Sequence, residues 1–161
     1  MSRNTFEAAS YAGLWYEYAR TPNWFEPCAY NVTARYKFEH GKDEIDIENT
    51  MENNFGKQVI HAVGTLDANS DVYSVQFDGC CCFRGSYCVL KLNSPEVTSG
   101  LYTHALVGDA PRNGRYAWIL SREPVMDPKL YDEYVAHAKF LGYTGVFTKT
   151  PQFPRSGARV L

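Results

Sequence analysis

The segment Gly13-Leu14-Trp15-Tyr16-Glu17-Tyr18-Ala19-Arg20 decides how the rest of the chain is organised. Its aromatic residues favour a β-strand, and Gly13 lets the backbone bend sharply while another segment approaches closely. Trp15 follows two residues later, so it points to the same face of the strand as Gly13. A ring of this size on the inner face can close one end of a rolled sheet. The segment therefore predicts the first strand of a barrel.

A single ring does not seal such an opening, so Trp15 needs a partner. The best candidate is Arg122, which ends the aromatic and apolar segment 116–122. A guanidinium on an indole face is worth about 1–2 kcal/mol when it is partly desolvated. We expect Arg122 to stack on Trp15 and to tie the first strand to the last.

Alternation of apolar and polar residues predicts eight strands. In the segment 30–40, for example, Val32, Ala34, Tyr36 and Phe38 share one face. Turn residues separate the strands, which is typical of an all-β, eight-stranded, antiparallel up-and-down barrel. A barrel of this size has room inside for one small ligand. The expected strands cover residues 11–20, 30–40, 44–51, 57–67, 72–77, 86–92, 101–108 and 115–122.

The period of the pattern changes after the last strand. Asp127 and Pro128 are typical of a helix start, and an apolar stripe follows until Gly142. We expect this helix to pack on the outside of the barrel within a single domain of 161 residues. The expected parts are a loose lead-in over 1–10, the barrel over 11–122, the helix over 127–142, a short edge strand over 143–147 and a loose tail over 151–161.

Composition and charge exclude several classes of protein. The net charge is −2 and there is no basic run, so no nucleic-acid partner is expected. The polar residues 1–10 lack the apolar core of a secretory signal, and an odd number of cysteines fits a reducing compartment. We therefore expect a cytoplasmic protein, with a membrane-peripheral position as the alternative.

The five cysteines do not predict a metal site. Adjacent residues of an extended segment alternate faces, so three cysteines in a row converge poorly on one ion. Free thiols, or a redox-labile bridge between this run and Cys28, are the interpretations that we retain. No metal and no cofactor are expected. The cysteines are Cys28, Cys80, Cys81, Cys82 and Cys88.

Five ordered motifs make the chain resemble the lipocalin family, within the branch of bacterial lipocalins, plant temperature-induced lipocalins and apolipoprotein D. They cover about residues 11–152. The resemblance implies a barrel whose interior, the calyx, binds a small hydrophobic ligand such as a fatty acid, a lysophospholipid or a similar lipid. The motifs are residues 13–20, Phe25-Glu26, His104-Ala105-Leu106-Val107, Trp118-Ile119-Leu120-Ser121-Arg122 and Lys149-Thr150-Pro151-Gln152.

By analogy with lipocalins, inward-facing side chains of several strands would line the calyx. Small residues at Ala34, Ala62 and Gly64 would leave room, and tyrosine hydroxyls would supply polar anchors. The alternative is that these side chains merely fill a core. The expected lining residues are Val32, Ala34, Tyr36, Ile45, Ile47, Ala62, Tyr73, Val75, Phe77, Tyr87, Val89 and Trp118.

Glu17 shares the face of Trp15, so we expect it to point inward near the floor of the barrel. A buried carboxylate is costly unless it is paired. We interpret Glu17 as a structural hydrogen-bond partner of tyrosine or arginine side chains. A role toward a ligand head group, or as a proton acceptor, is the alternative.

Trp24 and Phe25 lie in a short, proline-bounded loop that the barrel topology places at the open end. Three uses of these rings are consistent with the sequence. They form a lid over the pocket, or make weak contact with a membrane interface, or pack on a neighbouring loop or on a second copy in a homodimer.

No enzyme motif is present: the chain has no Gly-x-Ser-x-Gly, no phosphate-binding glycine loop and no metal-ligand motif. We therefore predict a non-enzymatic protein that binds and transports or stores its ligand. One alternative is a lipocalin-type enzyme that uses cysteine chemistry on a lipid or peroxide, although Cys88 has the parity opposite to Tyr87. The other alternative is an interaction module without a ligand.

Overall fold

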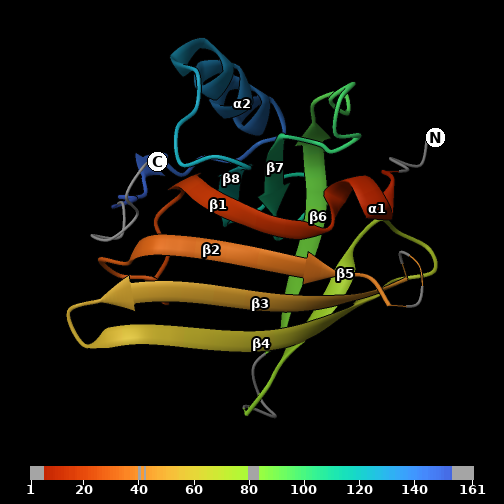
Figure 1. Cartoon of the computed structure of the whole chain (residues 1–161), viewed down its shortest axis with the longest axis horizontal. Helices are drawn as coiled ribbons and strands as arrows, with labels where there is room; N and C mark the ends of the chain where they lie inside the picture. Colours follow the sequence, from red (N-terminus) through yellow and green to blue (C-terminus); the bar gives the residue numbers. More distant parts are fainter. Residues whose placement is uncertain (1–5, 40, 42, 80–83, 154–161) are drawn as a thin grey trace.

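The computed structural model describes residues 6–39, 41, 43–79 and 84–153. Eight strands form a closed antiparallel barrel, because β1 pairs with β8 on one side and with β2 on the other. This confirms the predicted up-and-down barrel (Figure 1). The strands are β1 (Gly13–Arg20), β2 (Tyr30–Lys37), β3 (Glu44–Asn53), β4 (Gly56–Leu66), β5 (Tyr73–Phe77), β6 (Arg84–Leu92), β7 (His104–Gly108), β8 (Ala117–Ser121) and the additional β9 (Thr148–Lys149).

Strand β1 is the element on which the others converge. Its first half pairs with β2, and its second half pairs with β8 and with β9. The register to β8 shifts between Glu17 and Ala19, as in a β-bulge. Strict alternation would place Arg20 on the face opposite to Glu17. The bulge instead brings the two side chains together, with Arg20 Nη1 2.7 Å from Glu17 Oε1.

The barrel has two different ends. The closed end holds Trp15, Arg122 and the short helix α1 (Ala8–Tyr11). The open end holds the loop between β1 and β2 and the turn between β3 and β4. In Figure 1, α1 lies at the right and the β3–β4 turn lies at the left. β1 therefore runs from the closed end to the open end.

Helix α2 (Pro128–Phe140) packs on the outside of the barrel, as predicted. Asp127 caps its first turn by accepting a hydrogen bond from Lys129 N at 2.7 Å. Tyr134 and Ala138 are buried against Leu106 and Ile119, which point outward from β7 and β8. None of the described helices is long and apolar enough to cross a membrane.

Two segments differ from the sequence-based prediction. The lead-in is ordered near its end, where α1 carries the buried Tyr11, so that β1 begins at Gly13. The edge strand expected at 143–147 is wrong, because the strand that pairs with β1 is β9. Tyr143 is buried instead, and its hydroxyl donates to the carbonyl of Ala110.

The start of the expected loose tail is also tied to the barrel. Gln152 Nε2 donates to the carbonyls of Glu17 and Val32, at 2.9 Å each, and so links β1 to β2 where they diverge. Residues 154–161, the remainder of that tail, lie outside the described residues, as does the run Cys80–Cys82.

Candidate functional site

Trp15 and Arg122 seal the closed end. The guanidinium carbon of Arg122 lies 3.9 Å from the Trp15 ring centroid, so the expected stack is present. Arg122 also donates five hydrogen bonds to backbone carbonyls, three of them to residues 10–12. Gly13 has a φ of +97°, a backbone conformation that residues with a side chain rarely adopt. A Cβ at this position would lie 3.5 Å from Arg122 Nη1, which is an ordinary van der Waals distance. Glycine is therefore required for the backbone conformation rather than for space.

A tyrosine cluster lies next to Trp15 inside the barrel. The hydroxyls of Tyr11 and Tyr87 share a hydrogen bond. The Tyr36 ring centroid lies 5.2 Å from that of Tyr11 and 5.6 Å from that of Tyr87. Burial raises the pKa of Tyr36 to about 12 and raises the pKa values of the other two. These hydroxyls therefore remain protonated at neutral pH and can donate hydrogen bonds.

Most of the expected lining residues lie in one hydrophobic cluster inside the barrel. Val32 does not, because it packs with Ala29 and Met51 nearer the open end. Gly64 leaves no room, because a Cβ there would lie 2.8 Å from Ile45 Cγ2. The cluster holds Ala34, Tyr36, Ile45, Ile47, Ala62, Tyr73, Val75 and Tyr87, with Phe77, Val89 and Trp118 packed against it.

Tyr11 and Tyr102 of this cluster were not among the expected lining residues, and neither were Ala105, Val107 and Leu120. The last three lie on β7 and β8. They alternate with the outward-facing Leu106 and Ile119. Alternation along β7 and β8 was therefore a usable signal for them.

The interior becomes more exposed toward the open end along two strands. On β5, the exposed fraction is 1% at Tyr73 and 4% at Val75, and Phe77 is half-buried. On β8, Leu120 is buried and Trp118 is half-buried. On these two strands, the apolar wall is therefore more accessible toward the open end.

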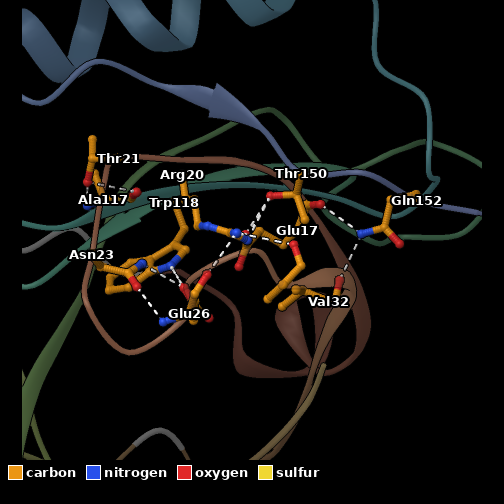
Figure 2. Close-up of polar contacts among 11 residues, drawn as sticks. Glu17, Arg20, Thr21, Asn23, Glu26, Val32, Ala117, Trp118, Thr150 and Gln152 are labelled. Carbon is orange, nitrogen blue, oxygen red and sulfur yellow. Dashed lines mark hydrogen bonds and ion pairs between the residues drawn. The ribbon is translucent and has the colours of Figure 1, made fainter. Parts of the chain in front are cut away.

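A buried polar cluster lies at the open end, and Figure 2 shows its contacts. We call Glu17, Arg20, Glu26 and Thr150 the open-end cluster. Arg20 Nη1 donates to Glu17 Oε1 at 2.7 Å, and Thr150 Oγ1 donates to the same oxygen at 2.5 Å. Arg20 Nη2 donates to the carbonyls of Glu26 and Ala29 at 3.0 and 3.1 Å. The cluster thus fastens the β1–β2 loop and the C-terminal segment to β1.

The contacts of Glu17 correct one expectation and support another. Its side chain does not lie at the floor, because its partners come from the open end. Its pairing with an arginine fits the structural interpretation made from the sequence.

Two carboxyl groups in this cluster accompany one guanidinium. Glu17 and Glu26 are buried, with exposed fractions of 3% and 7%. Burial, followed by the charge of Glu26, raises the pKa of Glu17 to about 8, although Arg20 and Thr150 act in the opposite direction. Glu17 therefore holds a proton for most of the time at neutral pH. With that proton the cluster is neutral, and without it the cluster carries one negative charge.

Glu26 joins the β1–β2 loop to the barrel wall. Its Oε2 accepts from Asn23 Nδ2 at 2.7 Å and from Trp118 Nε1 at 3.1 Å, as Figure 2 shows. Its backbone N–H donates to Asn23 Oδ1 at 2.8 Å. Glu26 and Thr150 lie in two of the motifs, but the sequence indicates no role for either. The contacts that join them to the barrel, Glu26 with Trp118 and Thr150 with Glu17, span 92 and 133 positions along the chain.

The two aromatic residues of the loop have different surroundings. Phe25 packs on Tyr116 and Trp118, with ring centroids 5.4 and 6.2 Å apart. Trp24 contacts Phe25 but remains 66% exposed. Phe25 therefore covers the aromatic edge of the open end, while Trp24 presents most of its surface to solvent.

The described cysteines are an exposed Cys28 and a buried Cys88, both free. Cys88 Sγ donates to the carbonyl of Gly108 at 3.4 Å, and burial raises the pKa of its thiol to about 12. The redox-labile bridge between Cys28 and the cysteine run, one of the two interpretations made from the sequence, involves residues outside the described ones. Within the described part of the chain, no three His, Cys, Asp or Glu side chains are grouped to hold a metal ion.

Residues 6–152 match the family model described as the lipocalin-like domain. The chain is 30% identical over 141 residues to the outer membrane lipoprotein Blc of Vibrio cholerae. The aligned region covers 86% of this chain and 77% of that protein. It is 32% identical over 152 residues to temperature-induced lipocalin-1 of Arabidopsis thaliana, covering 88% and 77%. Insecticyanin from the tobacco hornworm Manduca sexta has the same fold, with a TM-score of 0.70 at 18% identity over 98% of this chain and 86% of that one.

The Vibrio cholerae relative contradicts the expected cytoplasmic location. The Vibrio cholerae protein is named an outer membrane lipoprotein, which places it in the cell envelope. The expectation rested on a polar N-terminal segment and an odd number of cysteines. The described barrel closes by pairing between β1 and β8, so the number of cysteines does not indicate the compartment.

Proposed function

Because the chain belongs to the lipocalin family, whose members bind small hydrophobic ligands, we propose that it binds and carries one such ligand inside its barrel. The observation that carries this proposal is the apolar cluster inside the barrel, whose exposure rises toward the open end on β5 and β8. Such a concave, mostly apolar surface with a few polar groups is typical of a small-molecule site. An elongated lipid with one alkyl chain, such as a fatty acid or a lysophospholipid, fits this arrangement.

The proposed site consists of the interior residues that the sequence indicated, extended by Ala105, Val107 and Leu120. Trp15 and Arg122 close its far end. The hydroxyls of the tyrosine cluster are the polar groups at that end, and they are uncharged. An alkyl chain lying along the apolar wall is therefore the occupant that this site favours.

Binding is a better proposal than catalysis by Cys88. The thiolate is the reactive form of cysteine, and the raised pKa keeps the Cys88 thiol protonated at neutral pH. Its contact with Gly108 also places it away from Tyr87, whose ring lies in the interior cluster.

The first test is ligand binding by the intact protein. N-phenyl-1-naphthylamine, an uncharged apolar dye, should gain fluorescence with a Kd of about micromolar, equivalent to roughly −8 kcal/mol. Val75→Trp should abolish this by filling the interior. Ser74→Trp is the matched control, because Ser74 is exposed on the same strand. Equal binding by both variants would place the dye outside the barrel.

Mass spectrometry of ligands released from the purified protein gives the second test. A lipid recovered from wild type and reduced in Val75→Trp supports carriage. Recovery of none, together with no dye binding, supports the interaction module instead.

We also propose weak contact between the open end and a membrane surface. Large apolar residues are exposed there: Trp24, Phe55 in the β3–β4 turn, and Phe153, which packs on Tyr30. Aromatic rings are favoured at membrane interfaces. Such contact would let a lipid pass between membrane and barrel.

Flotation with neutral phosphatidylcholine vesicles tests this contact. Trp24→Ala should reduce flotation, whereas Val97→Ala should not, because Val97 is fully exposed in the loop before β7 at the closed end. Equal flotation of both variants contradicts the proposal. If Trp24→Ala changes only the sedimentation coefficient, the surface is a homodimer contact.

A further inference from the structure

We infer that the open end selects lipids with uncharged head groups over lipids with anionic ones, through the buried carboxylate of Glu26 beside the Trp118 indole. The inference rests on the proposed function and narrows its ligand class from single-chain lipids in general to those with uncharged head groups, such as long-chain alcohols or monoacylglycerols. Ionised fatty acids are then bound less tightly than these.

The first step locates the head group. The closed end is filled by Trp15, which is completely buried beneath the Arg122 guanidinium. An amphiphile therefore enters with its alkyl chain first and leaves its head at the open end. Trp118 is the half-buried member of the interior cluster at that end, next to Phe25. The head group thus lies beside the Trp118 indole.

The second step concerns the charge beside that position. Trp118 Nε1 donates to Glu26 Oε2 at 3.1 Å. A head group that contacts this indole therefore lies next to the Glu26 carboxylate. Figure 2 shows Glu26 next to Trp118, and Arg20 and Glu17 in the same network of contacts. A second anion at this distance is repelled strongly, because the surroundings are partly buried.

The third step is that Arg20 does not neutralise an incoming anion. Its donors already point at Glu17 Oε1, at Thr150 Oγ1 and at two backbone carbonyls. Its side chain is also largely buried, with an exposed fraction of 14%. The guanidinium is therefore engaged by the protein itself, and a ligand carboxylate would add uncompensated negative charge to the cluster.

One exposed cation lies on the same aromatic surface. The Arg115 guanidinium is 5.4 Å from the centroid of Tyr116, the ring on which Phe25 packs. Arg115 is exposed, so water and salt screen its charge more than the charges of the buried carboxyls. We therefore expect the carboxyl groups, rather than Arg115, to determine which head group is bound. The alternative, that Arg115 binds an anionic head group, is tested by Arg115→Gln.

The experiment uses two lipids with the same chain. Oleyl alcohol and oleate compete with N-phenyl-1-naphthylamine for the intact protein at pH 7.5. Glu26→Gln keeps an oxygen that accepts from Trp118 and Asn23 but removes the charge. It should tighten oleate roughly tenfold and leave oleyl alcohol within about twofold. Glu44→Gln, exposed at the closed-end start of β3, is the control and should change neither Kd.

Three outcomes overturn the inference. The first is an unchanged ratio of oleate to oleyl alcohol Kd in Glu26→Gln. If that variant fails to fold, Glu17→Gln replaces it in a competition at pH 9, where the Glu17 carboxyl of wild type has lost its proton, and should shift the ratio in the same direction. The second is a tenfold loss of oleate affinity in Arg115→Gln, which would assign the head group to that cation. The third is failure of the dye and both lipids to bind wild type, in which case the proposed function itself fails.

Discussion

The two ends of the barrel use arginine in different ways. At the closed end, Arg122 lies on Trp15 and donates only to backbone carbonyls. At the open end, Arg20 shares its donors between a carboxylate, a hydroxyl and the carbonyls of a loop. The first arrangement contains no carboxyl group, whereas the second holds two in a buried cluster.

Because of this difference, the two ends of the barrel should respond differently to a change of pH. Packing of a large ring and hydrogen bonds to neutral carbonyls depend little on pH. A buried cluster of two carboxyls and one guanidinium changes its net charge when one proton leaves. We therefore expect the closed end to hold the barrel together under all moderate conditions, and the open end to depend on pH.

Truncation of the two interior tryptophans should give the largest contrast. Trp15→Ala should lower the free energy of unfolding by about 3–5 kcal/mol, because a completely buried ring leaves a cavity. Trp118→Ala should cost less, roughly 1–3 kcal/mol, because its ring is half-buried. Urea unfolding of both variants measures the difference. Equal losses would contradict the distinction between the two ends.

The free energy of unfolding should depend on pH because Glu17 gains or loses a proton. Its pKa rises from an ordinary value of 4.5 to about 8 in the folded protein, so the protonated form stabilises the fold. That contribution is complete below about pH 4.5 and is lost as the pH rises through 8. Between these limits the free energy of unfolding should fall by up to about 1.4 kcal/mol per pH unit.

Glu17→Gln is the comparison that isolates this effect, because the amide keeps the shape and cannot ionise. Its urea-unfolding free energy should depend less on pH than that of wild type between pH 5 and 8. Parallel curves for the two proteins would mean that Glu17 remains ionised beside Arg20.

Replacement of the closed-end guanidinium should have a smaller effect than loss of the ring. Arg122→Lys keeps the charge, but a single ammonium cannot reach five carbonyls in different directions. We expect a loss of about 2 kcal/mol in the free energy of unfolding, nearly constant from pH 5 to 8. Arg115→Lys, at an exposed position, is the control and should stay within about 0.5 kcal/mol of wild type. A strong pH dependence of the Arg122→Lys loss would remove the contrast with the open end.

The smallest expected effect concerns the attachment of the C-terminal segment. Thr150→Val keeps the shape of the buried side chain but removes its hydrogen bond to Glu17. It should cost about 1 kcal/mol. Thr148→Val, on the exposed face of β9, should cost almost nothing. A loss in Thr148→Val as large as that in Thr150→Val would show that strand pairing, rather than the cluster, holds this segment.

The closed end was readable from the sequence because its parts carry strong local signals. Gly13 and Trp15 are two residues apart on one strand, and Arg122 ends a clear aromatic strand. Alternation then predicted the barrel and most of its interior. Tyr11 was assigned to the strand because a helix of four residues is too short to show a helical period.

The open end could not be read in the same way. Its cluster joins residues up to 133 positions apart, Glu17 and Thr150. Arg20 reaches Glu17 only because a bulge interrupts the alternation of β1. No local sequence pattern predicts that bulge. The resemblance to lipocalins brought Glu26 and Thr150 to notice as motif residues without indicating their partners.

The sequence by itself therefore determined the barrel, the helix outside it and the ring and cation that close one end, because period and residue type act over a few neighbouring positions. Only the tertiary structure decided which polar side chains meet at the other end and how many charges they bury. Those properties depend on strand register and on the path of the C-terminal segment, and both are set by packing between elements far apart along the chain.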